Sequence, residues 1–370
     1  RFDGTASFDA ARGIWWAKFA SLGGNMKAEG LDLAAAAIDG NVNLEGRETL
    51  LSARVELNGA SITDARRPMR IAPLVLMGKA EYTPSAVGFK GDLGFTDGPV
   101  MALDARYRVS ERRGSLQADL PAWSFTKGRA QPQDLFPPLK GVVTDVSGSL
   151  KAEARIGWTG SRTTSTARIE LGEIGFGTAP AEIAGVSGQV EIADLLHLKT
   201  DQPQTLSVGL LDAGLPLRGG TLTFDLPGKD AVHIVKASWP VAGGTLELNN
   251  LNIPFDRPPD LVVADLKNLD AADLARNLDI DGLEADGTLA GSIPVRITED
   301  GPVIDDARIW SLKNGGLKFR SQVALESLKQ SGEMAELLSR ALSDFRYTDL
   351  QMSMNGPLSG DITAKAIYDA

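Results

Sequence analysis

The sequence has 370 residues, of which 43% are hydrophobic and 23% are charged. This is the composition of an ordinary folded protein, and it excludes a disordered chain. The formal net charge of −10 argues against nucleic-acid binding, because an acidic surface repels phosphate backbones. The absence of cysteine excludes disulfide bonds, thiolate metal sites and cysteine nucleophiles.

Both ends of the sequence lie in runs that are typical of strands, so we expect a fragment of a longer protein. No apolar run approaches the ~20 residues that a membrane-spanning helix needs. The longest, Ile71–Met77, also contains a proline. We therefore expect any signal or membrane anchor to lie outside these residues.

Apolar and polar residues alternate through most of the chain. The clearest runs are Leu51–Leu57, Val87–Phe95, Leu103–Val109 and Leu116–Leu120. A period of two predicts a strand with one dry face and one wet face, as in antiparallel sheets that are open to water on one side. The sequence therefore predicts an all-β protein.

Two alternating runs are unusually long. Val142–Trp158 covers seventeen residues, or roughly 55 Å at ~3.3 Å per residue, and Leu283–Ile297 is nearly as long. Typical strands have ~5–6 residues. Each run is either one long strand or a strand that bends at Gly148, Gly287 or Gly291, where a bulge would fit.

Glycine pairs predict turns between strands. Gly219–Gly220, Gly243–Gly244 and Asn314–Gly316 resemble the residues of two-residue hairpin loops. Gly172–Gly177 lacks the order of a phosphate-binding loop and is also expected to be a turn.

Only two segments have a helical period. Asp270–Leu278 is short, with Asp270 as its N-cap. Ser331–Phe345 is longer, and its apolar residues recur at i, i+3 and i+4, so we expect this amphipathic helix to pack on the sheet. The predicted fold is therefore all-β with one short and one longer helix.

The chain carries no recognisable catalytic or metal-binding motif. His197 and His233 are expected to be surface or turn residues. The carboxylate pairs Asp279/Asp281 and Asp305/Asp306 are expected to be solvated surface charges. We predict no enzyme activity, no cofactor and no metal. The apolar faces of the strands fit either a filled core between two sheets or an open apolar lining, and alternation alone leaves both open.

A series of short motifs occupies the last third of the chain, residues 261–368. The motifs are Leu269–Ala275, Asp286–Val295, Asn314–Phe319, Ala341–Leu350 and Asn355–Gly360, with looser matches at Pro121–Phe125 and Gln133–Pro137. In these motifs the chain resembles the YdbH family, within the AsmA-like group that includes TamB and YhdP.

The resemblance implies a periplasmic protein that is anchored in the inner membrane. It implies long antiparallel strands curled into an extended groove, a β-taco, through which phospholipids pass between the two membranes of a Gram-negative cell. We accordingly expect residues 1–370 to form one continuous groove segment with the 331–345 helix packed on it. A small outer-membrane lipoprotein is the implied partner at the C-terminal end of the full-length protein.

The predicted groove lining is drawn from the apolar faces of the strands. It consists of Val55, Leu57, Phe89, Leu93, Phe95, Val146, Leu150, Ile156, Trp158, Leu246, Leu248, Leu289, Ile293, Val295 and Ile297. The main alternative is a structural protein or outer-membrane assembly factor with a filled β-core. A carbohydrate-active β-helix enzyme would need clustered aromatic and acidic residues, and the sequence shows no such cluster.

Overall fold

The computed structural model describes residues 2–369 apart from 23–25, 29–32, 48, 96–97, 128–130, 179–180, 214–215, 229, 256, 278–281, 299–300, 320–344 and 359–362. Strands dominate the described residues, and paired strands run antiparallel. The all-β prediction is confirmed. The chain divides into two compact units, Arg1–Asp201 and Gln202–Ala370, which we call unit 1 and unit 2.

Unit 1 is a single sheet of long strands with one short helical insertion. Its elements are β1 (Phe2–Asp9), β2 (Ile14–Leu22), β3 (Met26–Ala28), β4 (Leu33–Arg47), β5 (Thr49–Asp64), β6 (Leu74–Thr83), β7 (Ala86–Phe95), β8 (Gly98–Arg108), β9 (Arg113–Phe125), α1 (Pro132–Leu135), the 3₁₀ helix η2 (Pro137–Leu139), β10 (Thr144–Thr159), β11 (Arg162–Gly177) and β12 (Glu182–Ile192).

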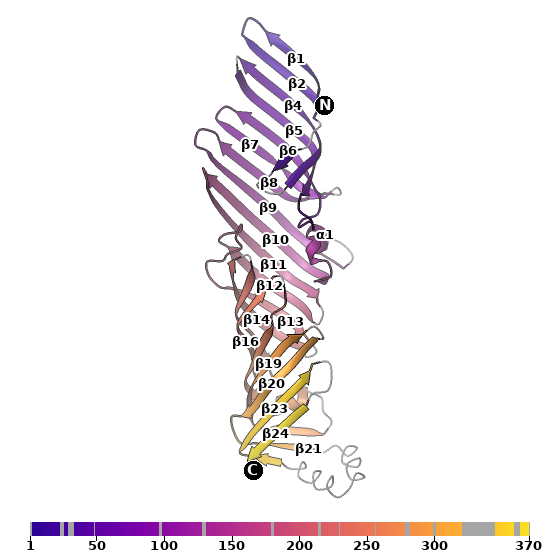
Figure 1. The fold of residues 1–370 in the computed structure, drawn as a ribbon, viewed down its shortest axis with the longest axis vertical. Helices are drawn as coiled ribbons and strands as arrows, with labels where there is room; N and C mark the ends of the chain where they lie inside the picture. Colours follow the sequence, from indigo (N-terminus) through magenta and orange to yellow (C-terminus); the bar gives the residue numbers. More distant parts are fainter. Residues whose placement is uncertain are drawn as a thin grey trace. The chain divides into compact units, whose positions relative to one another are not determined.

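Each strand from β4 to β11 pairs with the next strand in the sequence. Strands β2 and β3 share the other edge of β4, and β1 pairs with β2. Figure 1 shows the strands of unit 1 as a ladder of neighbours. Short turns, such as the one between Thr83 and Ala86, make this order possible, because antiparallel neighbours need only a hairpin.

Unit 2 contains a larger and a smaller sheet. In the larger sheet each strand pairs with the next in the order β13, β14, β15, β16, β17, β19, β20, β23 and β24. In the smaller sheet β21 pairs with both β18 and β22. The elements are β13 (Gln204–Asp212), β14 (Pro216–Gly228), β15 (Ala231–Val241), β16 (Gly244–Pro254), β17 (Leu261–Asp270), α2 (Ala271–Asn277), β18 (Leu283–Asp286), β19 (Thr288–Thr298), β20 (Gly301–Ser311), β21 (Gly315–Phe319), β22 (Phe345–Tyr347), β23 (Asp349–Pro357) and β24 (Thr363–Asp369).

The short helix was predicted correctly. Helix α2 begins after Asp270, whose carboxylate accepts a hydrogen bond from the Asp273 backbone N–H at 2.9 Å, as an N-cap does. The predicted helix at 331–345 lies outside the described residues except for Phe345, which begins strand β22. Helix α1 and η2 were not predicted, because they are short and proline-rich and show no helical period.

The two long runs have different outcomes. Strand β10 is continuous from Thr144 to Thr159, with register shifts beside Gly148, which has a φ of 98°. The second run breaks at Gly287, which has a φ of 115°, and its halves β18 and β19 join different sheets. Glycine permits both irregularities because positive φ is unfavourable for other residues.

Only part of the predicted turn chemistry is confirmed. Ala242 and Gly243 both have positive φ in the hairpin between β15 and β16, as a type I′ turn requires. Gly219–Gly220 lies inside β14 and Gly172–Gly177 inside β11, so those two predictions are wrong. Both segments have cross-strand partners, which the local sequence does not reveal.

Candidate functional site

The apolar face of the unit 1 sheet is aligned by the strand register. Val55 on β5 lies opposite Ala80 on β6, which lies opposite Phe89 on β7. Directly opposite residues in an antiparallel sheet project to the same side. The complete row across the sheet consists of Phe19, Val42, Val55, Ala80, Phe89, Ala105, Leu116 and Ile156.

Two parallel rows extend this face on either side. One consists of Ala17, Leu44, Ala53, Tyr82, Val87, Tyr107, Gly114 and Trp158. The other consists of Leu57, Gly78, Gly91, Leu103, Ala118, Ala154, Ala167 and Ile192. None of the residues in the three rows is charged, so the face is continuously apolar across the strands.

The side chains of this face are mostly half-buried and not enclosed. This holds for the predicted lining residues on β5, β7 and β10, namely Val55, Leu57, Phe89, Leu93, Phe95, Leu150, Ile156 and Trp158. Val146 differs, because it is buried beside the α1 segment, where it bonds with Gln131. The rows therefore retain apolar surface in contact with solvent.

Aromatic side chains cluster at both ends of the central strands. The Trp123 ring lies 6.4 Å from Phe95 and 5.0 Å from Phe125, measured between ring centroids. At the opposite end, Tyr107 and Trp158 stack with centroids 6.5 Å apart and ring planes 16° apart. Large rigid rings at these positions enlarge the apolar area with little loss of side-chain entropy.

The α1 end of the sheet is held by buried polar groups. Asp64, whose side chain is fully buried, accepts hydrogen bonds from the Arg70 guanidinium and from the backbone N–H groups of Arg66 and Arg70. These bonds hold the pKa of Asp64 well below its usual value, with the Arg70 side chain as the main cause. The Gln131 side chain bonds to the backbone of Thr126 and Val146, which anchors the start of α1.

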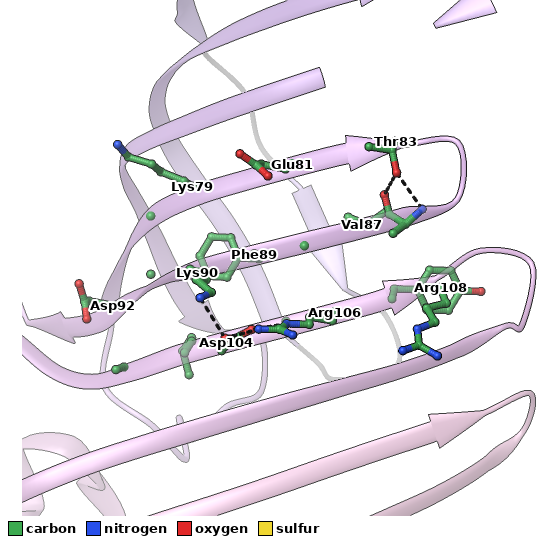
Figure 2. A pocket seen from close by; sticks show the side chains of 18 of the residues that line it. Lys79, Glu81, Thr83, Val87, Phe89, Lys90, Asp92, Asp104, Arg106 and Arg108 are labelled. Atoms are coloured by element: carbon green, nitrogen blue, oxygen red, sulfur yellow. Dashed lines mark hydrogen bonds and ion pairs between the residues drawn. The ribbon is translucent and has the colours of Figure 1, made fainter. Parts of the chain in front are cut away.

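The opposite face of the unit 1 sheet, which we call the charged face, carries cross-strand ion pairs. Lys79 lies 3.1 Å from Glu56, and Lys90 lies 3.5 Å from Asp104, measured between nitrogen and oxygen. Figure 2 shows Lys90, Asp104 and Arg106 joined across β7 and β8, beside a hollow of about 1100 Å³. Exposed pairs add little stability, but they favour this register, which keeps charge off the apolar face.

In unit 2 the apolar face is partly covered. Leu289 is buried in a cluster with Leu266, Leu269 and Ile309, and helix α2 contributes Ala271. The predicted lining residues Leu246, Leu248, Ile293, Val295 and Ile297 remain half-buried. Their register shows that Leu248, Ala264 and Ile293 share one row. Unit 2 therefore combines a packed cluster under α2 with a less enclosed apolar face.

Titratable groups in the described parts of unit 2 form ion pairs and hydrogen bonds. Glu247 contacts Lys236 at 2.9 Å and Lys267 at 2.7 Å, and these lysines lower its pKa to about 2, Lys267 first. His233 bonds to Asn250 and Asp225, which together raise its pKa. No group of three or more His, Asp or Glu side chains among the described residues is placed to hold a metal ion.

The family described as intermembrane phospholipid transport protein YdbH matches residues 6–366. The chain belongs to the YdbH-like family. No curated protein and no solved structure matches the chain. The YdbH-like match covers nearly the whole chain, far more than the last third in which the motifs were found.

Membership of the YdbH-like family places the chain among intermembrane phospholipid transport proteins. None of the helices in the described ranges has the length and hydrophobicity of a transmembrane segment. Sequence reasoning missed Trp123 and Phe125 as part of the apolar face, although Pro121–Phe125 had been noted as a loose family motif. Alternation stops at Pro121, so the sequence pattern does not reveal that Trp123 packs between Phe95 and Phe125.

Proposed function

We propose that the chain forms part of a hydrophobic groove along which phospholipids pass through the periplasm between the inner and outer membranes. Acyl tails lie on the apolar face of the sheet, and headgroups stay in water. The supporting observation is the uncharged, half-buried face whose central row extends from Phe19 on β2 to Ile156 on β10. The family match supports the cargo.

The proposed mechanism is partition followed by sliding. Burying one methylene group stabilises the bound state by ~0.8 kcal/mol, so two acyl chains gain enough to remain bound. Hydrophobic attraction has no preferred direction. A tail that moves from Val55 to Ala80 to Phe89 therefore exchanges one apolar contact for a similar one. No covalent bond is made or broken.

The longer protein is proposed to be anchored in the inner membrane and to meet a small outer-membrane lipoprotein at its C-terminal end. Both proposals rest on the family resemblance. Site-specific crosslinking of the full-length protein in cells tests the second one. A crosslinked adduct with a lipoprotein supports it, and adducts restricted to other proteins contradict it.

The groove proposal is tested by native mass spectrometry and lipid extraction on protein purified without detergent. We expect phospholipid in several copies on the wild type. Leu150→Asp and Phe89→Asp in unit 1, and Ile293→Asp in unit 2, place a charge on the apolar face and should reduce bound lipid severalfold. Desolvating an unpaired carboxylate is strongly unfavourable, which is why these changes should exclude acyl chains.

Thr166→Asp is the matched control. Thr166 is exposed on the charged face of β11 opposite Arg155, so the variant adds the same charge without touching the apolar rows. It should keep wild-type lipid content. Circular dichroism and thermal melting verify that each variant folds. Lipid-free wild-type protein that melts cooperatively would instead support the filled-core alternative, a structural or outer-membrane assembly factor.

A further inference from the structure

Arginines gather on the charged face of unit 1 where the strands β8, β9 and β11 meet their turns. Arg108 lies opposite Arg113, Arg113 lies opposite Thr159, and Thr159 lies opposite Arg162. Arg106 is two residues further along β8 on the same face. Neighbouring strands are ~4.8 Å apart, so the row from Arg108 to Arg162 spans only ~15 Å.

These cations are incompletely neutralised. Arg106 pairs with Asp104 at 3.3 Å and Arg108 with Glu111 at 3.2 Å. Across the described residues, no carboxylate lies within ion-pair distance of Arg113 or Arg162. Like charges directly opposite each other destabilise a sheet. A chain with a net charge of −10 thus concentrates positive charge at one site, where a bound anion would offset the repulsion.

The four arginines line one hollow of about 710 Å³ together with the hydroxyl side chains of Thr159 and Thr164. Guanidinium groups present planar pairs of N–H donors that match the oxygens of a phosphate. The Thr159 hydroxyl accepts a hydrogen bond from Arg113 Nε at 3.5 Å, and the Thr164 hydroxyl donates to the Gly157 carbonyl at 3.4 Å. Gly157 also lines the hollow and adds no side chain to it. The donor set fits a phosphate ester.

The same strand ends carry the aromatic pair on the apolar face. Tyr107 lies between Arg106 and Arg108 in β8, and Trp158 stacks on Tyr107. Successive residues of a strand point to opposite faces. The arginines therefore lie on the opposite face from Tyr107 and Trp158, at the same edge of the sheet, which the turns form. Lipid tails on the apolar face would end beside the two aromatic rings at this edge. Aromatic rings at such an apolar–aqueous boundary are common in lipid-facing proteins.

We propose that Arg106, Arg108, Arg113 and Arg162 form a phosphate-binding site for the headgroup of a phospholipid whose tails occupy the apolar face. This proposal depends on the proposed groove function and adds recognition of the lipid headgroup to it. A lipid entering at this edge is held at two points, by its tails on one face and by its phosphate on the other.

The test compares two lipids with the same acyl chains, phosphatidylglycerol and diacylglycerol, which lacks the phosphate. Purified protein is equilibrated with phosphatidylcholine vesicles containing one labelled lipid, and the lipid bound per protein is counted after flotation. Charge-assisted hydrogen bonds contribute ~1.5–3 kcal/mol, so the wild type should favour phosphatidylglycerol roughly tenfold or more. Raising the salt concentration should reduce this preference, because the arginines are exposed.

In the double variant Arg113→Gln, Arg162→Gln, the ratio of bound phosphatidylglycerol to bound diacylglycerol should be close to one. Arg54→Gln with Arg168→Gln is the control, since it removes the same charge from ion pairs elsewhere on this face and should keep the wild-type ratio. Melting curves verify folding. An unchanged ratio in the Arg113 and Arg162 variant overturns the proposal.

Failure of the groove and failure of the site give different results. Wild-type uptake of both lipids without preference contradicts the arginine site alone. Uptake of neither lipid contradicts the groove, and with it the assignment of this site to a lipid. In that case calorimetric binding of inorganic phosphate, lost in the Arg113 and Arg162 variant, would assign the arginines to a soluble phosphate.

Discussion

Tryptophan rings lie over glycines of the neighbouring strand at several positions. Trp158 covers Gly114, Trp15 covers Gly46 and Trp239 covers Gly220, and at each glycine an added Cβ would overlap the ring. A large ring thus fills the space that the missing side chain leaves, which compensates for the weak packing of glycine in a strand. Of these tryptophans only Trp158 was predicted from the sequence to lie on the apolar face, and the glycine partners follow only from the register.

The Gly114→Ala variant tests this contact. The added methyl group should displace the Trp158 ring and destabilise the protein by ~1–3 kcal/mol, as overpacking does. Chemical denaturation gives the stability change, and tryptophan fluorescence gives the ring displacement. Gly88→Ala is the control, because the nearest atom to its added Cβ would be 4.0 Å away. Equal effects of both variants would contradict the packing role of Gly114.

Glu247 makes a pH-dependent contribution to stability. Its pKa is lowered from 4.5 to about 2 by Lys267 and Lys236. A lowered folded-state pKa stabilises the protein above the unfolded value, and this contribution is lost as the pH falls from about 4.5 towards 2. The melting temperature of Glu247→Gln should therefore lie below that of the wild type at pH 7, and the difference should shrink near pH 2.

Calorimetry across this pH range measures the difference. Glu182→Gln is a suitable control, because Glu182 is exposed on β12. A difference between Glu247→Gln and the wild type that stays constant from pH 7 to pH 2 would contradict the assignment. Neither lysine could be matched to Glu247 from the sequence, because Lys236 is on β15 and Lys267 on β17.

At the scale of elements, the strands were largely predictable and their interruptions were not. Alternation located β5, β7, β8, β9 and β10, because each has one wet face and one dry face. The predicted alternatives for the second long run were a continuous strand and a bend at a glycine, and neither includes the break at Gly287 that sends β18 and β19 to different sheets. The α1 segment was missed because its anchoring depends on a buried glutamine, which composition does not reveal.

The α1 segment offers a matched pair of substitutions. Gln131→Leu removes the bonds from the side chain to the Val146 N–H and C=O and should destabilise the protein by ~1–3 kcal/mol. The Oε1 atom of Gln133 is buried without a hydrogen-bond partner in the described part of the chain. Gln133→Leu should consequently be neutral or stabilising. Denaturant titrations compare the two variants, and similar losses in both would refute the proposed anchor.

At the scale of the whole molecule, the family and the fold class could be inferred from the sequence. The division into two units could not, because the strand pattern does not change near Asp201. The expected single groove over residues 1–370 stays a prediction. The buried cluster under α2 was also invisible in the sequence, since Leu289 belongs to the same alternating pattern as the half-buried Ile293.

An unfilled apolar face predicts that lipid stabilises the protein. Delipidated protein should melt at a lower temperature, and added phospholipid should restore ~2.7 kcal/mol of stability at a free concentration of 100 times its Kd. Differential scanning calorimetry measures the shift. The Leu150→Asp variant should show a much smaller response. A wild-type melting temperature that is independent of lipid would contradict an unfilled face.

The neighbour-to-neighbour pairing of unit 1 constrains how such a protein can change in length. Removing one strand reverses the direction of every later strand, whereas removing a hairpin such as β6–β7 restores antiparallel pairing between the remaining neighbours. Insertions and deletions in this ladder are therefore expected to come in pairs of strands. Each pair changes the path across the strands by ~10 Å, so the span adjusts in steps of one hairpin.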